Sequence, residues 1–199
     1  MGAREEDAVR LVLASGSPRR AHILRTLGVS FRVVVSAVDE SLVPGEAGAA
    51  AVERLARAKA EAVSRGEPLP VLAADTEVVC DGRILGKPES ELGALEMLAL
   101  LAGRTHEVVT GVCVAYGGKL RSGVERSEVR LSPMTEAERG WYVATGEPLD
   151  KAGGYHVDGR GALFIESVTG SPSNVAGLPV RLVWRLFQEA GLRLESSLR

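Results

Sequence analysis

Residues 11–20 read Leu-Val-Leu-Ala-Ser-Gly-Ser-Pro-Arg-Arg, and this stretch predicts a strand, a tight loop and the start of a helix. The apolar run 11–14 is typical of a short buried strand. Ser17 suits the residue that caps a helix, and Pro18 suits the first helical position. A strand that leads directly into a helix favours an α/β fold.

Two arginines follow at the start of this predicted helix. Arg19 and Arg20 fall in the first turn, where the helix dipole disfavours cations by about 0.3–1 kcal/mol. A bound anion would reverse this penalty, because free backbone N–H groups, a serine-rich loop from Ser15 and two guanidiniums together form a phosphate cradle. The alternative is a capped surface helix with two solvated arginines, since basic helix starts are common.

The bulk composition indicates an ordinary globular protein. The chain has 199 residues, of which 45% are hydrophobic and 25% are charged, enough for one sizeable core or two small lobes. The net charge of -2 argues against general affinity for nucleic acid or anionic membranes. Residues 1–10 are charged and lack the apolar stretch of a signal peptide, so we expect a cytoplasmic protein. Cys80 and Cys113 have no partner at metal-ligand spacing, which favours buried core residues over a zinc site.

The order of elements along the chain predicts a mixed α/β fold with two lobes and a cleft between them. A Gly-Gly pair at 117–118 predicts the turn of a long hairpin. We expect residues 1–10 to form a lead-in, 11–192 to form one two-lobed domain, and 193–199 to form a tail. Helices are expected over 19–27, 49–64, 91–101, 135–144 and 179–190, and strands over 11–14, 31–35, 71–80, 83–85, 106–116, 120–131 and 163–168.

Lys59 interrupts the apolar stripe of the predicted helix over 49–64, between Leu55-Ala56 and Ala62-Val63. An ammonium group that faces inward is costly unless it meets an anion. The central position therefore favours a functional lysine, while the alternative is a lysine that extends its charge to water from the edge of the stripe.

Asp75 follows the buried run 71–74, and the carboxyl end of a strand is where open α/β sheets place their sites. Asp75 and Glu77 share a face of the strand by alternation. A carboxylate here can bind Mg²⁺ or activate water, whereas the alternative is a hydrogen-bonded turn residue. Glu40, after the second strand, is a candidate second metal ligand or simply a solvated carboxylate.

Two further lysines are candidates for phosphate contacts. Residues 82–87 resemble a Walker loop only superficially, because the glycine spacing is short and Pro88 replaces the Ser or Thr that would hold Mg²⁺. Lys87 remains a candidate phosphate ligand as an isolated charge. Lys151 lies in the glycine-rich loop 145–154, which is either solvated or a lip that contacts phosphate. The three histidines have no nucleophile motif near them and are expected to be structural or surface groups: His22, His106 and His156.

Six short motifs follow one another in a specific order. They are 15–20 (SGSPRR), 74–76 (ADT), 87–88 (KP), 105–106 (TH), 146–155 (GEPLDKAGGY) and 174–179 (NVAGLP). In this order the motifs resemble the Maf family of nucleoside triphosphate pyrophosphatases over roughly residues 10–192. The resemblance implies an elongated α/β fold of the inosine-triphosphatase type, with a deep central cleft and a homodimeric assembly. It also implies hydrolysis of a nucleoside triphosphate to a monophosphate and pyrophosphate, with Mg²⁺ or Mn²⁺ as cofactor.

The resemblance also assigns roles to individual residues. It implies that Asp75 is the proton acceptor or a metal-bound carboxylate, that Glu40 is a metal-side carboxylate, and that Arg19 and Thr76 govern substrate choice. The run 150–155 resembles the subgroup that acts on dTTP and UTP rather than the one that acts on 7-methyl-GTP. Further positions match polyphosphate-binding residues of the family: Ser15, Arg20, Lys59 and Lys87.

One departure from the subgroup leaves the preferred base open. The subgroup has Gln before the glycine at 159, and this chain has Asp158 as its candidate base-contacting residue. We therefore expect a dTTP and UTP pyrophosphatase that cleans the nucleotide pool, with a broader, purine or modified-base preference as the alternative. A nucleotide-binding regulator of cell division without turnover is the alternative from another class. Asp75, Lys59 and Lys87 favour the enzyme, because cleavage between phosphates needs an activated water and cations for the developing charge.

Overall fold

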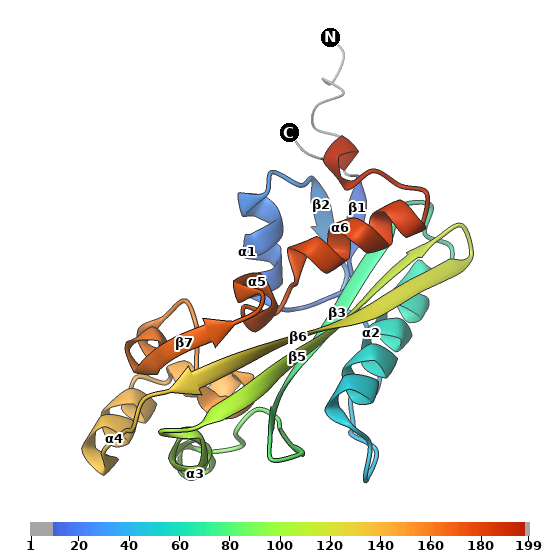
Figure 1. Cartoon of the computed structure of the whole chain (residues 1–199). Coiled ribbons are helices and arrows are strands. Elements are labelled where there is room, and N and C mark those ends of the chain that lie inside the picture. The colour runs from blue at the N-terminus through green and yellow to red at the C-terminus, as the bar shows by residue number, and fades with distance from the viewer. Residues whose placement is uncertain (1–9, 198–199) are drawn as a thin grey trace.

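A single long sheet organises the described part of the chain (Figure 1). The computed structural model describes residues 10–197, so most of the predicted lead-in and residues 198–199 lie outside the described residues. Within that range the sheet has seven strands in the order β2-β1-β3-β5-β6-β7, with β4 paired to β3. The strands are β1 (Leu11–Leu13), β2 (Phe31–Val33), β3 (Val71–Cys80), β4 (Arg83–Leu85), β5 (Thr105–Tyr116), β6 (Lys119–Leu131) and β7 (Ile165–Thr169).

Strand direction changes across the sheet. The pairs β1–β2 and β1–β3 are parallel, whereas β3–β4, β3–β5, β5–β6 and β6–β7 are antiparallel. The predicted mixed α/β fold is therefore confirmed. Figure 1 shows an elongated molecule, with α1, α6, β1 and β2 towards one end and α3, α4 and β7 towards the other.

Helices cover both faces of the sheet. They are α1 (Pro18–Thr26), α2 (Gly48–Ser64), α3 (Glu91–Leu101), α4 (Glu136–Ala144), α5 (Pro172–Val175) and α6 (Val180–Glu189), with 3₁₀ turns η2 (Glu147–Asp150), η3 (Ala152–Gly154), η4 (Arg160–Phe164) and η5 (Leu194–Ser197). Alternation along β1 divides the core, since Val12 packs towards α2 whereas Leu11 and Leu13 pack towards α1 and α6. Leu194, in the predicted tail, belongs to the same core cluster as Leu11 and Leu13. No helix among residues 10–197 has the length and apolar character needed to cross a membrane.

The helix α2 lies unusually close to the sheet at Gly111. A Cβ built on Gly111 would lie 2.2 Å from the backbone oxygen of Val52, so any larger residue there would force the two elements apart. Gly111 is the register partner of Asp75 on the neighbouring strand β3. The absence of this side chain therefore lets α2 approach the sheet next to Asp75.

The apolar run 71–74, taken alone, predicts that Asp75 ends its strand, but it does not. It lies in the middle of β3, which continues without interruption to Cys80. The first residues of β3 pair with β1 and the last pair with β4, so the strand gains a new partner after β1 has ended. Asp75 thus lies beside the end of β1 and the loop that follows it.

Candidate active site

A cavity of about 590 Å³ opens between the start of α1, the middle of β3 and the segment that ends at His156. Residues 15–20, which follow β1, form one wall, and β3 contributes Asp75, Thr76 and Glu77. Most residues predicted for the site line this one cavity: Ser15, Arg19, Arg20, Glu40, Lys59, Asp75, Thr76, Lys87 and Lys151. Asp158 is the exception, because it is exposed and does not belong to the cavity wall.

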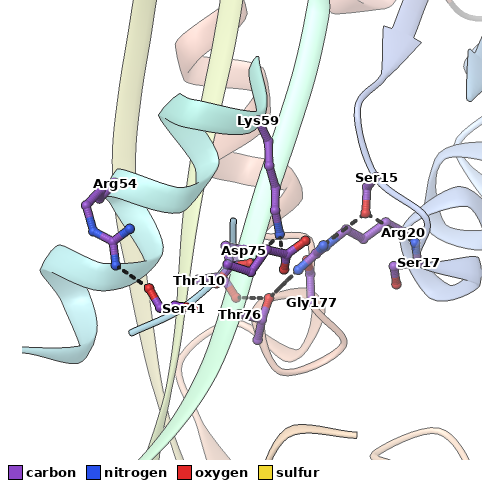
Figure 2. Close-up of polar contacts among 11 residues, drawn as sticks. Ser15, Ser17, Arg20, Ser41, Arg54, Lys59, Asp75, Thr76, Thr110 and Gly177 are labelled. Atoms are coloured by element: carbon purple, nitrogen blue, oxygen red, sulfur yellow. Dashed lines mark hydrogen bonds and ion pairs between the residues drawn. The ribbon is translucent and has the colours of Figure 1, made fainter. Parts of the chain in front are cut away.

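Lys59 and Asp75 form a buried ion pair at the centre of the cavity wall (Figure 2). Lys59 Nζ lies 2.7 Å from Asp75 Oδ1 and 2.7 Å from Glu40 Oε2. Only 5% of Lys59 is exposed, so the lysine faces inward and does not extend to water. Ala62, which the periodicity places in the same apolar stripe, is exposed instead because the stripe turns away from the sheet near the end of α2. The anion that Lys59 meets in the free protein is therefore the protein's own pair of carboxylates.

Glu77 also lines the cavity, although it is not among the site residues predicted from the sequence. One of its carboxylate oxygens is buried without a hydrogen-bond partner among the described residues. Burial and the neighbouring charge of Asp75 raise the pKa of Glu77 to about 7, against the opposing effect of Lys59 and Lys87. Alternation along β3 is the sequence pattern that finds it, since it places Glu77 on the same face as Asp75.

Arg20 is held rigidly at the start of α1 (Figure 2). Only 8% of it is exposed. Its Nε donates to the backbone oxygen of Gly177 at 2.8 Å, Nη1 donates to Ser15 Oγ at 3.0 Å, and Nη2 donates to Thr76 Oγ1 at 2.9 Å. Burial lowers the pKa of Arg20, and Asp75 opposes that shift. Arg20 thus presents a fixed cation to the cavity, as the cradle interpretation predicts.

Ser17 occupies the N-cap position of α1 but makes no capping hydrogen bond with its side chain. The oxygen at this helix start comes from Ser15 instead, whose Oγ accepts from the backbone N–H of Ser17 at 3.2 Å. The first turn of α1 also lacks an acidic residue. This helix start thus has the features of an anion site rather than of a capped surface helix.

The other end of the cavity carries Arg19 and the segment from Asp150 to His156. Burial lowers the pKa of Arg19, and the charges of Asp150 and Asp158 oppose the shift. Lys151 is paired with the adjacent Asp150. His156, which is expected from the sequence to be a structural or surface group, lies in the wall of the cavity. Because His156 lies in a loop with no regular period, no pattern in the sequence points to it.

The carboxylate oxygens of Asp75 and Glu40 are suitable ligands for a divalent ion that is also bound by the phosphates of a substrate. Within residues 10–197, no group of three or more His, Cys, Asp or Glu side chains is arranged to hold a metal by itself. The ammonium of Lys59 contacts both predicted metal ligands, Glu40 and Asp75. Mg²⁺ is usually bound by one or two carboxylates together with water and substrate phosphates, so a complete protein cage is not required.

The fold and cavity define a mixed α/β protein in which a helix start that carries a buried arginine lies beside a buried carboxylate. The chain belongs to the Maf-like protein family, whose model matches residues 10–190. It is 51% identical over 189 residues to a dTTP/UTP pyrophosphatase of Anaeromyxobacter sp. (strain Fw109-5), covering 92% of this chain and 91% of that relative. It is 48% identical over 186 residues to a dTTP/UTP pyrophosphatase of Moorella thermoacetica, covering 92% and 96% respectively. Among solved structures, the Staphylococcus aureus Ham1 protein is similar over 62% of this chain and 72% of its own, with a TM-score of 0.44 and 16% identity.

Proposed function

We propose that this protein is a nucleoside triphosphate pyrophosphatase that converts dTTP and UTP to their monophosphates and pyrophosphate. The observation that carries the proposal is the buried carboxylate of Asp75, which lies in the same cavity as the phosphate-binding start of α1. Relatives that align over nine-tenths of the chain bear the same activity in their names.

The cavity supplies cations for a polyphosphate. Arg20 and the first turn of α1 offer N–H donors at one wall, and Lys87 adds an exposed charge at another. Lys59 is already paired with Asp75 and Glu40, so its main effect is to hold these carboxylates in place. Arg19 and Lys151 line the same cavity and would contact the part of the nucleotide beyond these phosphate groups.

Asp75 is the group that we assign as proton acceptor for the attacking water. Asp75 is 6% exposed, and its carboxylate is held from one side by Lys59, which leaves the cavity side for a water molecule. We propose that Asp75 and Glu40 would hold Mg²⁺ or Mn²⁺ together with the substrate's phosphates. Such an ion, when bound, neutralises negative charge on the phosphate oxygens.

The choice of base is proposed to depend on Arg19 and Asp158. Arg19 lines the cavity and interacts electrostatically with Asp158, which lies outside its wall. An ionised Asp can only accept hydrogen bonds, which suits the adjacent N–H donors of guanine, whereas a Gln amide also donates to a pyrimidine carbonyl. We therefore expect Asp158→Gln to raise the ratio of kcat/KM for dTTP over GTP. An unchanged ratio would remove Asp158 from base reading.

The test is pyrophosphate release from a panel of nucleoside triphosphates with Mg²⁺. The wild type should release pyrophosphate from dTTP and UTP, and Asp75→Asn should lose about 10²–10⁴-fold in kcat if Asp75 acts as general base. The matched control is Asp81→Asn, an exposed residue at the end of the same strand, where the backbone φ of 49° tolerates Asn. Turnover by Asp75→Asn within about tenfold of wild type contradicts its role. Nucleotide binding without turnover of any triphosphate would identify a regulator instead.

We further propose that the protein acts as a homodimer in the cytoplasm without nucleic-acid or membrane partners. The family resemblance supports the dimer, and the net charge of -2 supports the absence of polyanionic partners. Light scattering of the purified protein at increasing salt measures the assembly, and a monomeric mass throughout would contradict it.

A further inference from the structure

The segment around α5 is tied firmly into the sheet, although the proposed reaction assigns it no role. Asn174 is fully buried. Its Nδ2 donates to the backbone oxygen of Val108 on β5 at 2.9 Å and to Ser127 Oγ on β6 at 3.0 Å. These bonds fix the backbone from Asn174 to Gly177, whose oxygen accepts the Arg20 Nε hydrogen. The segment therefore connects two sheet strands to the cation of the cavity.

A chain of hydroxyls makes a second connection to the same arginine. Thr110 Oγ1 on β5 donates to the backbone oxygen of Asn174 at 3.3 Å, and it lies 3.0 Å from Thr76 Oγ1. Thr76 Oγ1 in turn accepts from Arg20 Nη2 at 2.9 Å (Figure 2). Each hydroxyl has one hydrogen to donate. The Thr76 hydrogen can go to Thr110 Oγ1 or to the backbone oxygen of Gly177, 3.4 Å away, and the bond between the two threonines can run in either direction. In both directions Thr110 is hydrogen-bonded to Thr76, which accepts from Arg20, and such chains strengthen cooperatively.

This arrangement orients the two donors of Arg20 that remain for a ligand. A guanidinium carries five N–H groups in one plane. Ser15, Thr76 and Gly177 accept one each from Nη1, Nη2 and Nε, which leaves one hydrogen on each terminal nitrogen. Two such hydrogens form the fork that binds a phosphate through two oxygens. The direction of the fork depends on where Thr76 and Gly177 hold the plane.

We propose that Thr110 is a positioning residue for the phosphate grip of Arg20, acting through Thr76. The proposal rests on the pyrophosphatase function and specifies how its phosphate site is built. It also gives the Thr76 hydroxyl a definite task, which is to hold the guanidinium rather than to contact a base. Thr110 is fully buried and does not line the cavity, so it can affect a ligand only through these bonds.

The experiment compares Thr110→Val, which keeps the shape but removes the hydroxyl, with Thr110→Ser, which keeps the hydroxyl. Thr105→Val on the exposed start of β5 is the matched control. The measurements are KM and kcat for dTTP, and the dissociation constant of inorganic pyrophosphate by calorimetry. Thr110→Val should weaken pyrophosphate binding and raise KM by about fivefold to twentyfold, as expected for a hydrogen bond that serves a charged group. The Ser variant should stay within about threefold of wild type, and the ratio of dTTP to GTP efficiency should not change.

A double-mutant cycle with Arg20→Ala separates positioning from general packing. If Thr110 acts through Arg20, Thr110→Val should change pyrophosphate affinity by less than about twofold in the Arg20→Ala background. An equal loss in both backgrounds, or a Ser variant as weak as the Val variant, would overturn the proposal. Where Thr110→Val does not fold, Thr76→Val removes the next hydroxyl in the chain and should give the same pattern. Pyrophosphate calorimetry keeps the two proposals distinguishable, because wild type that binds pyrophosphate but hydrolyses no triphosphate contradicts the function alone.

Discussion

Lys59 on α2 and Asp75 on β3 are joined by a 2.7 Å ion pair in which neither side chain is more than a tenth exposed. The pair links the helix to the sheet at the centre of the cavity. In this interior, each charge makes burial of the other tolerable. Removing Lys59 leaves the Asp75 carboxylate without its cation, whereas removing Asp75 leaves Lys59 paired with Glu40. This relationship changes what is expected of substitutions at either residue.

Lys59→Met should destabilise the protein by about 3–5 kcal/mol, although methionine suits an apolar helix stripe. The cost arises because the Asp75 carboxylate stays buried and loses its cation. The double variant Lys59→Met with Asp75→Leu should recover most of the lost stability. Urea unfolding of the three proteins at pH 7.5 measures this, and a single-variant loss below about 1 kcal/mol would contradict a buried Asp75 that depends on the ammonium of Lys59.

Gly111→Ala should be among the most damaging small substitutions in the chain. The added methyl would lie 2.2 Å from the backbone oxygen of Val52, and neither backbone can retreat without separating α2 from β5. We expect a loss of about 3 kcal/mol or more, together with loss of activity as Lys59 moves away from Asp75. The control is Gly140→Ala, at an exposed helical position with open space, which should stabilise by about 0.5–1 kcal/mol. Equal thermal midpoints for the two variants would contradict the close approach.

Glu147 should affect binding of the nucleotide's base, because it holds the loop that follows His156. Its Oε1 accepts from the Tyr142 hydroxyl at 2.7 Å and from the Gly161 N–H at 2.9 Å, and Oε2 accepts from the Arg160 N–H at 3.0 Å. A Gln side chain has one oxygen and would turn its NH₂ towards one of these donors. Glu147→Gln should therefore release the loop after His156 and lower kcat/KM for dTTP by about tenfold, roughly 1.4 kcal/mol.

The same Glu147→Gln variant should bind inorganic pyrophosphate within about twofold of wild type, because the phosphate end is untouched. Glu136→Gln at the exposed start of α4 is the charge-matched control. Parallel losses for dTTP and pyrophosphate would indicate a general structural role for Glu147.

His106 should make folding sensitive to acid. It is 3% exposed, its Nε2 lies 2.8 Å from the Tyr155 hydroxyl, and burial lowers its pKa from 6.5 to about 4. In the unfolded chain His106 becomes protonated below about pH 6.5, whereas in the folded protein it stays neutral until about pH 4. The free energy of unfolding therefore falls as the pH drops through this window. At pH 4.5 this group should cost about 2–3 kcal/mol relative to pH 7.5.

Urea unfolding at both pH values tests this for wild type, His106→Gln and the exposed control His22→Gln. The wild type and His22→Gln should lose more stability at pH 4.5 than His106→Gln does. An equal loss in all three would show that His106 is not the titrating group.

Local patterns were sufficient for most elements because short-range physics creates them. The apolar run before Ser15 predicts β1, Pro18 marks the start of α1, and the 3.6-residue period of α2 turns Lys59 inward. The six motifs were also sufficient for the family, since their order along the chain does not depend on how the chain folds. The sequence by itself therefore determined the fold class, and all the predicted site residues except Asp158 lie in the cavity wall.

Tertiary structure decided which groups meet. The strand expected over 71–80 has the predicted bounds, but the exchange of β1 for β4 as the partner of β3 around Asp75 is a choice made between segments far apart in the sequence. Periodicity shows that Lys59 needs an anion but does not say which one, and only the packing of α2 over Gly111 brings it to Asp75. The hydroxyl chain from Arg20 to Asn174 joins four distant segments through single hydrogen bonds, and such contacts leave no period in the sequence. Residue patterns record which face of an element is buried, whereas the partner across that face is selected only when the whole chain packs.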